Sequence, residues 1–186
     1  MPAQPAKRWR ADEARRLNEA NALPWPRYEV IDGELLVSPA PRYLHQRAVK
    51  ELLFVLDRQL IGRPEIELLP GPADIELEAD STLSPDVMVF SRVEVRHWTD
   101  VTALLLVVEV LSPSTARTDR VKKRDYFLRN DVGEYWIVDL DARVVERWKH
   151  ADTRPDIVGD ELRTWIRDDT EIVIDIDRFF ARVCDE

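Results

Sequence analysis

One carboxylate stands out in the sequence because of the residues around it. Glu109 is the only charged side chain between Val101 and Ala116, and it interrupts an apolar run from Leu104 to Leu111. A run that is apolar on both faces is typical of a strand in the middle of a sheet, where an unpaired carboxylate costs several kcal/mol. Glu109 must therefore be protonated, be paired with an Arg or Lys of a neighbouring helix, or bind a cation.

A second carboxylate, Asp86, lies 23 residues before Glu109 and follows Pro85 at the start of the apolar run 87–90. Alone, an Asp at this place is typical of a strand start or a turn. If the two runs form neighbouring strands, both carboxylates can lie at one edge of the sheet. Oxygen ligands of this kind suit Mg²⁺ or Mn²⁺. We therefore predict that Asp86 and Glu109 are the ligands of a divalent cation.

A basic segment follows Glu109, within a helix predicted over residues 116–130. It carries six basic and two acidic side chains, namely Arg117, Arg120, Lys122, Lys123, Arg124 and Arg129 against Asp119 and Asp125. One interpretation is a solvated helix face, on which Asp119 and Lys123 form an i,i+4 pair. The other is that one lysine faces the carboxylates while the rest contact a phosphate backbone. Composition does not choose between them.

Two further polar residues are weaker candidates for the rim of the same cleft. Glu34 follows a predicted turn, and His45 stands near the start of a predicted helix. A histidine at a helix start is more often a capping or surface residue than a catalytic one. Other catalytic templates are missing from the sequence, which has no Gly-rich phosphate loop, no His-Glu-x-x-His segment and no Gly-x-Ser-x-Gly segment.

The elements that must position these residues follow from hydrophobic periodicity. Apolar residues spaced by three and four predict a helix over 42–60 with Leu44, Ala48, Leu52, Val55, Leu56 and Leu60 on its buried face. In the second helix, over 116–130, Val121, Phe127 and Leu128 are expected to face inward. Strands are predicted at 28–37 (a hairpin turned at Asp32-Gly33), 65–69, 74–78, 85–90, 104–111, 135–140, 144–148, 162–166 and 171–174, and a short helix at Phe179-Phe180. The order predicts a mixed α/β fold.

Length and composition restrict the class of protein. The chain has 186 residues and a formal net charge of −9, which excludes a uniformly basic nucleic-acid-binding surface. The only cysteine is Cys184, so neither a disulfide framework nor a Cys-rich zinc site is possible. No apolar run reaches the ~18 residues that span a membrane. We expect an N-terminal arm over 1–27 and one domain over 28–186, in a soluble, cytoplasmic protein with no membrane contact.

Several segments in the right order resemble one family. They are Tyr28-Glu-Val-Ile-Asp-Gly-Glu34 with Ser38-Pro39 and His45, Pro85-Asp86, Glu109-Val-Leu-Ser-Pro-Ser-Thr115, Asp119, Lys123 and Glu134-Tyr-Trp-Ile-Val-Asp139. Together they resemble the Uma-type endonuclease family of the PD-(D/E)xK superfamily. The resemblance implies a restriction-endonuclease-like core, an α/β (α+β) fold with a central mixed β-sheet flanked by helices.

The resemblance also implies roles for individual residues. Asp86 is similar to the first acidic metal ligand and Glu109 to the second, with the Val110 carbonyl as a further ligand. The common pattern has a lysine two residues after the second acid, but Leu111 stands there. In Uma-type chains the lysine lies on the following helix, where Lys123 matches and Lys122 is the adjacent alternative. The implied catalytic residues are Asp86, Glu109 and Lys123, with Mg²⁺ or Mn²⁺ as cofactor.

The resulting hypothesis is a divalent-metal-dependent endonuclease that hydrolyses DNA phosphodiester bonds. Because the strands of a duplex are related by two-fold symmetry, a homodimer is expected. The alternative, from another class, is a catalytically silent module of the same fold that acts in protein–protein or protein–DNA binding. Retention of all three of Asp86, Glu109 and Lys123 favours the enzyme.

Overall fold

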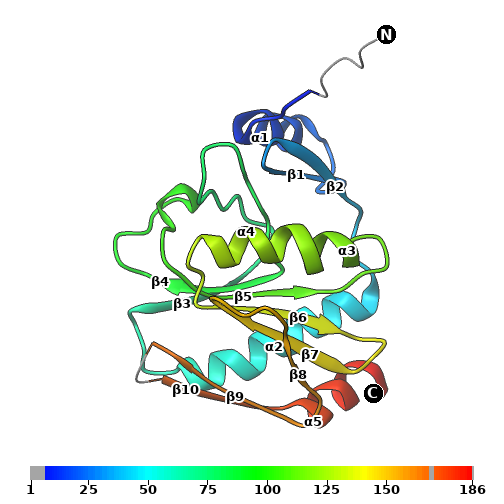
Figure 1. Ribbon diagram of the computed structural model, residues 1–186, viewed down its shortest axis with the longest axis vertical. Helices are drawn as coiled ribbons and strands as arrows, with labels where there is room; N and C mark the ends of the chain where they lie inside the picture. Colours follow the sequence, from blue (N-terminus) through cyan, green and yellow to red (C-terminus); the bar gives the residue numbers. More distant parts are fainter. Residues whose placement is uncertain (1–6, 168–169, 186) are drawn as a thin grey trace.

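The computed structural model describes residues 7–167 and 170–185. Its centre is a mixed six-stranded sheet in the order β3-β4-β5-β6-β7-β8, in which only β5 and β6 are parallel. The strands are β3 Ile66–Pro70, β4 Val87–Ser91, β5 Leu104–Val110, β6 Glu134–Asp139, β7 Val144–Lys149 and β8 Asp156–Val158. Helices cover both faces, α4 on one and α2 on the other (Figure 1). The predicted fold class is confirmed.

Strand β5 lies inside this sheet, as its composition predicts. Its neighbours are β4, antiparallel, and β6, parallel. Val108 belongs to the apolar core under α2, whereas Val107 belongs to the core under α4. The strand is therefore covered on both faces, and Glu109 follows within it.

Helix α2, Tyr43–Leu60, confirms the predicted helix and packs its apolar face on the sheet and on the C-terminal hairpin. That hairpin is formed by β9 Glu161–Ile166 and β10 Thr170–Asp175. The expectation for Leu44 is wrong, because this side chain is 43% exposed. Residues buried in α2 begin only at Ala48, so the first turn extends beyond the core. The predicted end helix is α5, Ile176–Phe180, continued by a π-helical turn at Ala181–Asp185.

The second predicted helix is interrupted. It consists of α3 Ala116–Thr118, a π-helical turn Asp119–Lys123 and α4 Arg124–Arg129. The wider turn changes which residues face inward. Val121, expected to be buried, is 45% exposed, while Asp119 and Lys123 are buried. The inward orientation of Phe127 is confirmed.

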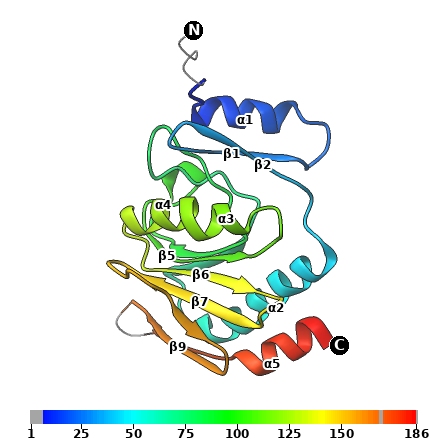
Figure 2. The same ribbon diagram turned by 45° about the vertical axis from the view of Figure 1, so that its right-hand side comes forward.

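A small unit lies at one end of the molecule, on the opposite side from α5 (Figure 2). It consists of α1 Ala11–Ala20 and the hairpin β1 Arg27–Ile31 and β2 Glu34–Ser38. The hairpin turns at Asp32 and Gly33, both with positive φ, as predicted. Asn18 links α1 to β1 through two hydrogen bonds. Its side chain accepts one from the Tyr28 amide at 2.9 Å and donates one to the Tyr28 carbonyl at 3.0 Å.

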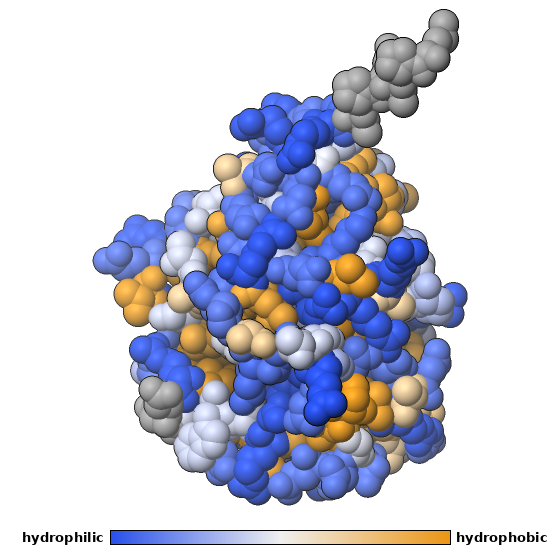
Figure 3. Space-filling model, viewed as in Figure 1, coloured by the Kyte–Doolittle hydropathy of each residue, from blue (hydrophilic) through white to orange (hydrophobic). Residues whose placement is uncertain are grey.

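The strand predicted at 74–78 is wrong. Only one isolated bridge forms there, between Ile75 and Leu83, and the Leu77 amide donates to the Tyr126 hydroxyl instead of to a strand. Alternation of apolar and polar residues in this segment thus reflects a loop that is buried on one side. On the face drawn in Figure 3, exposed apolar side chains form separate patches. Within residues 7–167 and 170–185, no helix is long and apolar enough to cross a membrane.

Candidate active site

The two predicted carboxylates meet at one edge of the sheet. Val87 in β4 pairs with Val108 in β5, so the next position along each strand places Asp86 opposite Glu109. The Val110 amide donates to Oδ2 of Asp86 at 2.8 Å, which fixes this carboxylate at the end of β5. Both side chains line the same pocket. The predicted juxtaposition therefore holds, although Asp86 is 22% exposed and Glu109 only 4%.

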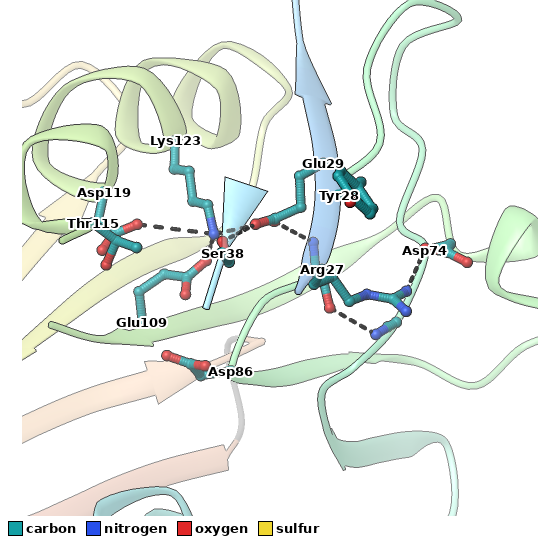
Figure 4. Close-up of polar contacts among 12 residues, drawn as sticks. Arg27, Tyr28, Glu29, Ser38, Asp74, Asp86, Glu109, Thr115, Asp119 and Lys123 are labelled. Carbon is teal, nitrogen blue, oxygen red and sulfur yellow. Dashed lines mark hydrogen bonds and ion pairs between the residues drawn. The ribbon is translucent and has the colours of Figure 1, made fainter. Parts of the chain in front are cut away.

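Lys123 is the lysine that contacts Glu109 (Figure 4). Its Nζ lies 2.9 Å from Oε1 of Glu109, 3.1 Å from Oε1 of Glu29 and 3.8 Å from Oδ1 of Asp119. All four side chains are buried. The adjacent Lys122 points elsewhere and pairs with Glu34. Of the two candidate lysines, only Lys123 lies within reach of the site.

Glu29 is a member of this cluster that the sequence analysis missed. It projects from β1, its Oε1 accepts from the Ser84 amide at 2.8 Å and its Oε2 accepts from the Ser38 hydroxyl at 3.0 Å. In the sequence it is one of three acids in a hairpin, and nothing there distinguishes it from Glu34. Glu34, expected at the rim of the cleft, does not line the pocket; it is 60% exposed and pairs with Lys122.

His45 belongs to the site and does not cap its helix. Its Nε2 lies 3.0 Å from Oδ2 of Asp86, the same oxygen that accepts from Val110. Its Nδ1 is buried and has no hydrogen-bond partner among the residues that the structure describes. The side chain is 13% exposed, so the capping or surface role that the helix-start position suggests does not apply.

These groups line a pocket of about 620 Å³. Its walls come from β1 and β2, the 39–42 connection, the first turns of α2, and the loops at 70–72, 84–86 and 112–115. The ionisable side chains Glu29, His45, Asp86, Glu109 and Lys123 thus come from five separate places in the chain, and the fold brings them to one pocket.

Comparison with known proteins gives the family. A family model described as "Uma2: Putative restriction endonuclease" matches residues 12–172. The chain belongs to the Uma2 family. The match extends beyond the segments that carry the sequence resemblance, since it includes most of α1 and reaches β10.

The fold of this Uma2 chain also recurs in a solved structure. That structure is described as a putative nuclease belonging to DUF820 from Anabaena variabilis. The two are 17% identical, with a TM-score of 0.74, and the alignment covers 94% of this chain and 98% of the other. At this identity the match concerns the fold. No curated protein matches the chain.

Burial and charge perturb the titration of the Uma2 site. Burial, reinforced by Asp86, Asp119 and Glu29 and opposed by Lys123, raises the pKa of Glu109 well above its usual range. Burial likewise raises the pKa of Asp119 to about 6, against the effect of Lys123 and a hydrogen bond from Thr115. The surrounding carboxylates raise the pKa of Lys123 despite its burial. Lys123 is therefore a permanent cation among carboxylates that it does not fully neutralise.

The pKa of His45 is also raised. Burial favours the neutral imidazole, but the hydrogen bond to Asp86 and the negative charge of that carboxylate outweigh it. A protonated His45 would donate from Nε2 to Asp86. Asp86 is thus held by two donors, the imidazole and the Val110 amide.

The basic residues of the helical segment do not form a free array. Besides Lys123, four of them make ion pairs within the chain: Arg120 with Asp139 and Glu146, Lys122 with Glu34, Arg124 with Asp125, and Arg129 with Asp32 and Glu78. The suggested contact of this whole face with a phosphate backbone is therefore not supported.

The donor set at the pocket fits a divalent cation. Asp86 and Glu109 both line the pocket, and Glu29 and Asp119 add negative charge around Glu109 and Lys123. Four carboxylates face one lysine and one histidine, an excess that a hard cation can neutralise. A second acidic group, Asp32, Glu78 and Asp80, is on the surface, where Arg129 and Arg8 already pair with it.

Proposed function

We propose that this Uma2 chain is a divalent-metal-dependent endonuclease that hydrolyses phosphodiester bonds in DNA. The observation that carries the proposal is the convergence of Asp86, Glu109 and Lys123 in one pocket, with Lys123 2.9 Å from Glu109. The match to a family of restriction-endonuclease-type proteins supports it.

In this proposal each residue has a distinct task. Asp86 and Glu109 hold Mg²⁺ or Mn²⁺, which when bound activates water and stabilises negative charge on the phosphoryl oxygens. Lys123 brings a permanent positive charge to the same space, where it orients the attacking water and screens a non-bridging oxygen.

Two further residues support these groups. His45 and the Val110 amide orient Asp86 through its Oδ2. Glu29 is a second carboxylate in contact with Lys123 and is itself fixed by hydrogen bonds from Ser38 and Ser84. Such second contacts keep catalytic groups in their productive geometry.

A second candidate function is a silent module that binds a partner and does not cleave. It is favoured by the contact between Lys123 and Glu109, because the lysine can neutralise this buried carboxylate without a metal ion. In that case the cluster acts only in stability.

Calorimetric titration with Mn²⁺ separates the two functions. We expect the wild type to bind the ion, Glu109→Gln to lose binding, and the exposed Glu34→Gln to retain it. Cleavage of DNA, offered both as plasmid and as single strands, should follow the same order. A folded wild type that binds no Mn²⁺, with or without DNA, would contradict the nuclease. The homodimer stays a prediction, to be measured by light scattering.

A further inference from the structure

Glu109 and Lys123 lie too deep in the pocket to reach a phosphate of a rigid nucleic-acid duplex. The side chains of Glu109 and Lys123 are 4% and 6% exposed, and both line the pocket. A base-paired duplex is stiff over about 150 base pairs and carries its phosphates on a wide rod. A phosphodiester in an unpaired strand rotates freely about its backbone bonds and can enter a pocket of about 620 Å³.

The pocket walls are stiff, so the opening resists widening. Five prolines line it, Pro39, Pro41, Pro70, Pro72 and Pro85, and proline has little backbone freedom. The hairpin above the pocket is tied down by two hydrogen bonds between the backbones of Val30 and Thr82, at 2.9 and 2.8 Å. Glu29 adds its bond from Ser84.

The charges near the opening suit a short stretch of backbone. Arg42 and Lys50 line the pocket, are exposed and make no ion pair with any residue in 7–167 or 170–185. By contrast, most basic residues of the 116–130 segment are paired within the chain. The two exposed, unpaired cations that line the pocket, on a chain of net charge −9, can hold a few phosphates but cannot follow a duplex.

An aromatic side chain stands at the same opening. Trp25 lines the pocket together with Arg42 and remains partly exposed. Unpaired bases stack on such rings, whereas bases inside a duplex are stacked on one another and unavailable. Sites for single-stranded nucleic acid combine cations that bind the phosphate backbone with aromatic side chains on which the bases stack.

We propose that the substrate of this pocket is an unpaired polynucleotide strand, bound through Arg42, Lys50 and Trp25, and that intact duplex is excluded. The proposal rests on the proposed function, since it names the substrate class of that site. It also removes the need for a dimer, because one pocket suffices to cut one strand.

Binding tests this directly. Fluorescence anisotropy would use metal-free wild type and an oligothymidine of about 20 nucleotides, longer than the ~4–16 nucleotides that one such site covers. A mixed-sequence duplex of the same length and an oligouridine are the other arms. We expect the unpaired strand to bind about tenfold or more tighter than duplex. The oligouridine arm shows whether the strand is DNA or RNA.

Matched variants locate the binding site. Trp25→Leu and Lys50→Gln should each weaken binding of the unpaired strand several-fold, whereas Trp165→Leu, at an exposed tryptophan outside the pocket, should not. Duplex binding equal to or tighter than single-strand binding would overturn the inference, as would no binding to either. Cleavage with Mn²⁺ is scored separately, so a chain that binds unpaired strands and cuts none contradicts only the nuclease.

Discussion

Replacement of Asp119 by Asn tests whether the ionised form of this buried carboxylate destabilises the folded protein. Asp119 is buried, its Oδ1 makes no hydrogen bond within the described residues, and Lys123 is 3.8 Å away. Burial raises its pKa from the ordinary 3.8 to about 6. The folded protein therefore binds this proton more tightly than the unfolded chain.

The sign and size of the effect follow from linkage. Because the folded pKa is raised, this group makes the wild type lose stability as pH increases from 4 to 7. The difference of about 2 units, at about 1.4 kcal/mol per unit, gives at most ~3 kcal/mol. Asp119→Asn has no such titration. Its free energy of unfolding minus that of the wild type should therefore rise by up to ~3 kcal/mol over the same pH range.

Urea denaturation from pH 4 to pH 8 measures this difference. Asp125→Asn is the matched control, since Asp125 lies on α4, is 55% exposed and pairs with Arg124. Its difference from wild type should stay nearly constant. If the Asp119→Asn difference changes by less than about 1 kcal/mol, the carboxylate is solvated or fully neutralised, and the reasoning about the cluster is refuted.

Three further substitutions test the site. Lys123→Met leaves Glu109 without its cation and should destabilise by about 3–5 kcal/mol in urea, against at most ~1 kcal/mol for Lys122→Met. His45→Ala removes a contact of Asp86 and should weaken Mn²⁺ binding about tenfold or more by calorimetry, while His150→Ala should not. Gly71→Ala places a Cβ 2.3 Å from the Pro85 carbonyl and should lower stability by about 1–3 kcal/mol, whereas Gly159→Ala meets nothing closer than 3.9 Å.

A different result would contradict each of these three predictions. Equal destabilisation by Lys123→Met and Lys122→Met would mean that the buried ion pairs contribute no more than a surface pair. Unchanged Mn²⁺ affinity in His45→Ala would mean that the contact with Asp86 does not position it. A stable Gly71→Ala would mean that the loop beside Asp86 moves easily, which would weaken the argument for a stiff pocket.

Elements with their own periodicity could be predicted from the sequence. Helix 42–60 and the central strand each repeat one pattern over many residues, and Asp32-Gly33 marks a turn by its backbone requirement. Segment 74–78 shows the limit, because alternation predicts a half-buried segment but not whether another strand lies beside it. There the partner is a single bridge and a tyrosine hydroxyl.

The same limit applies to the site. The proximity of Asp86 and Glu109 could be predicted. One carboxylate stands at the start of an apolar strand and the other lies within the next, so the two come close as soon as these strands pair. Glu29 could not be predicted, because its position depends on how the first hairpin packs over the sheet. Nor could the burial of Asp119, because the π-helical turn changes which residues face inward.

The position of the lysine follows from this same turn. Leu111, where the common pattern has a lysine, packs in the apolar core beneath α4. Lys123 instead reaches Glu109 from the π-helical turn, and π-helical turns occur often at functional sites. Glu29, Glu109 and Asp119 contact its ammonium from a hairpin, a strand and a helical turn. Tertiary structure places the charge, so a pattern that counts residues from Glu109 misses a lysine that lies 2.9 Å from it.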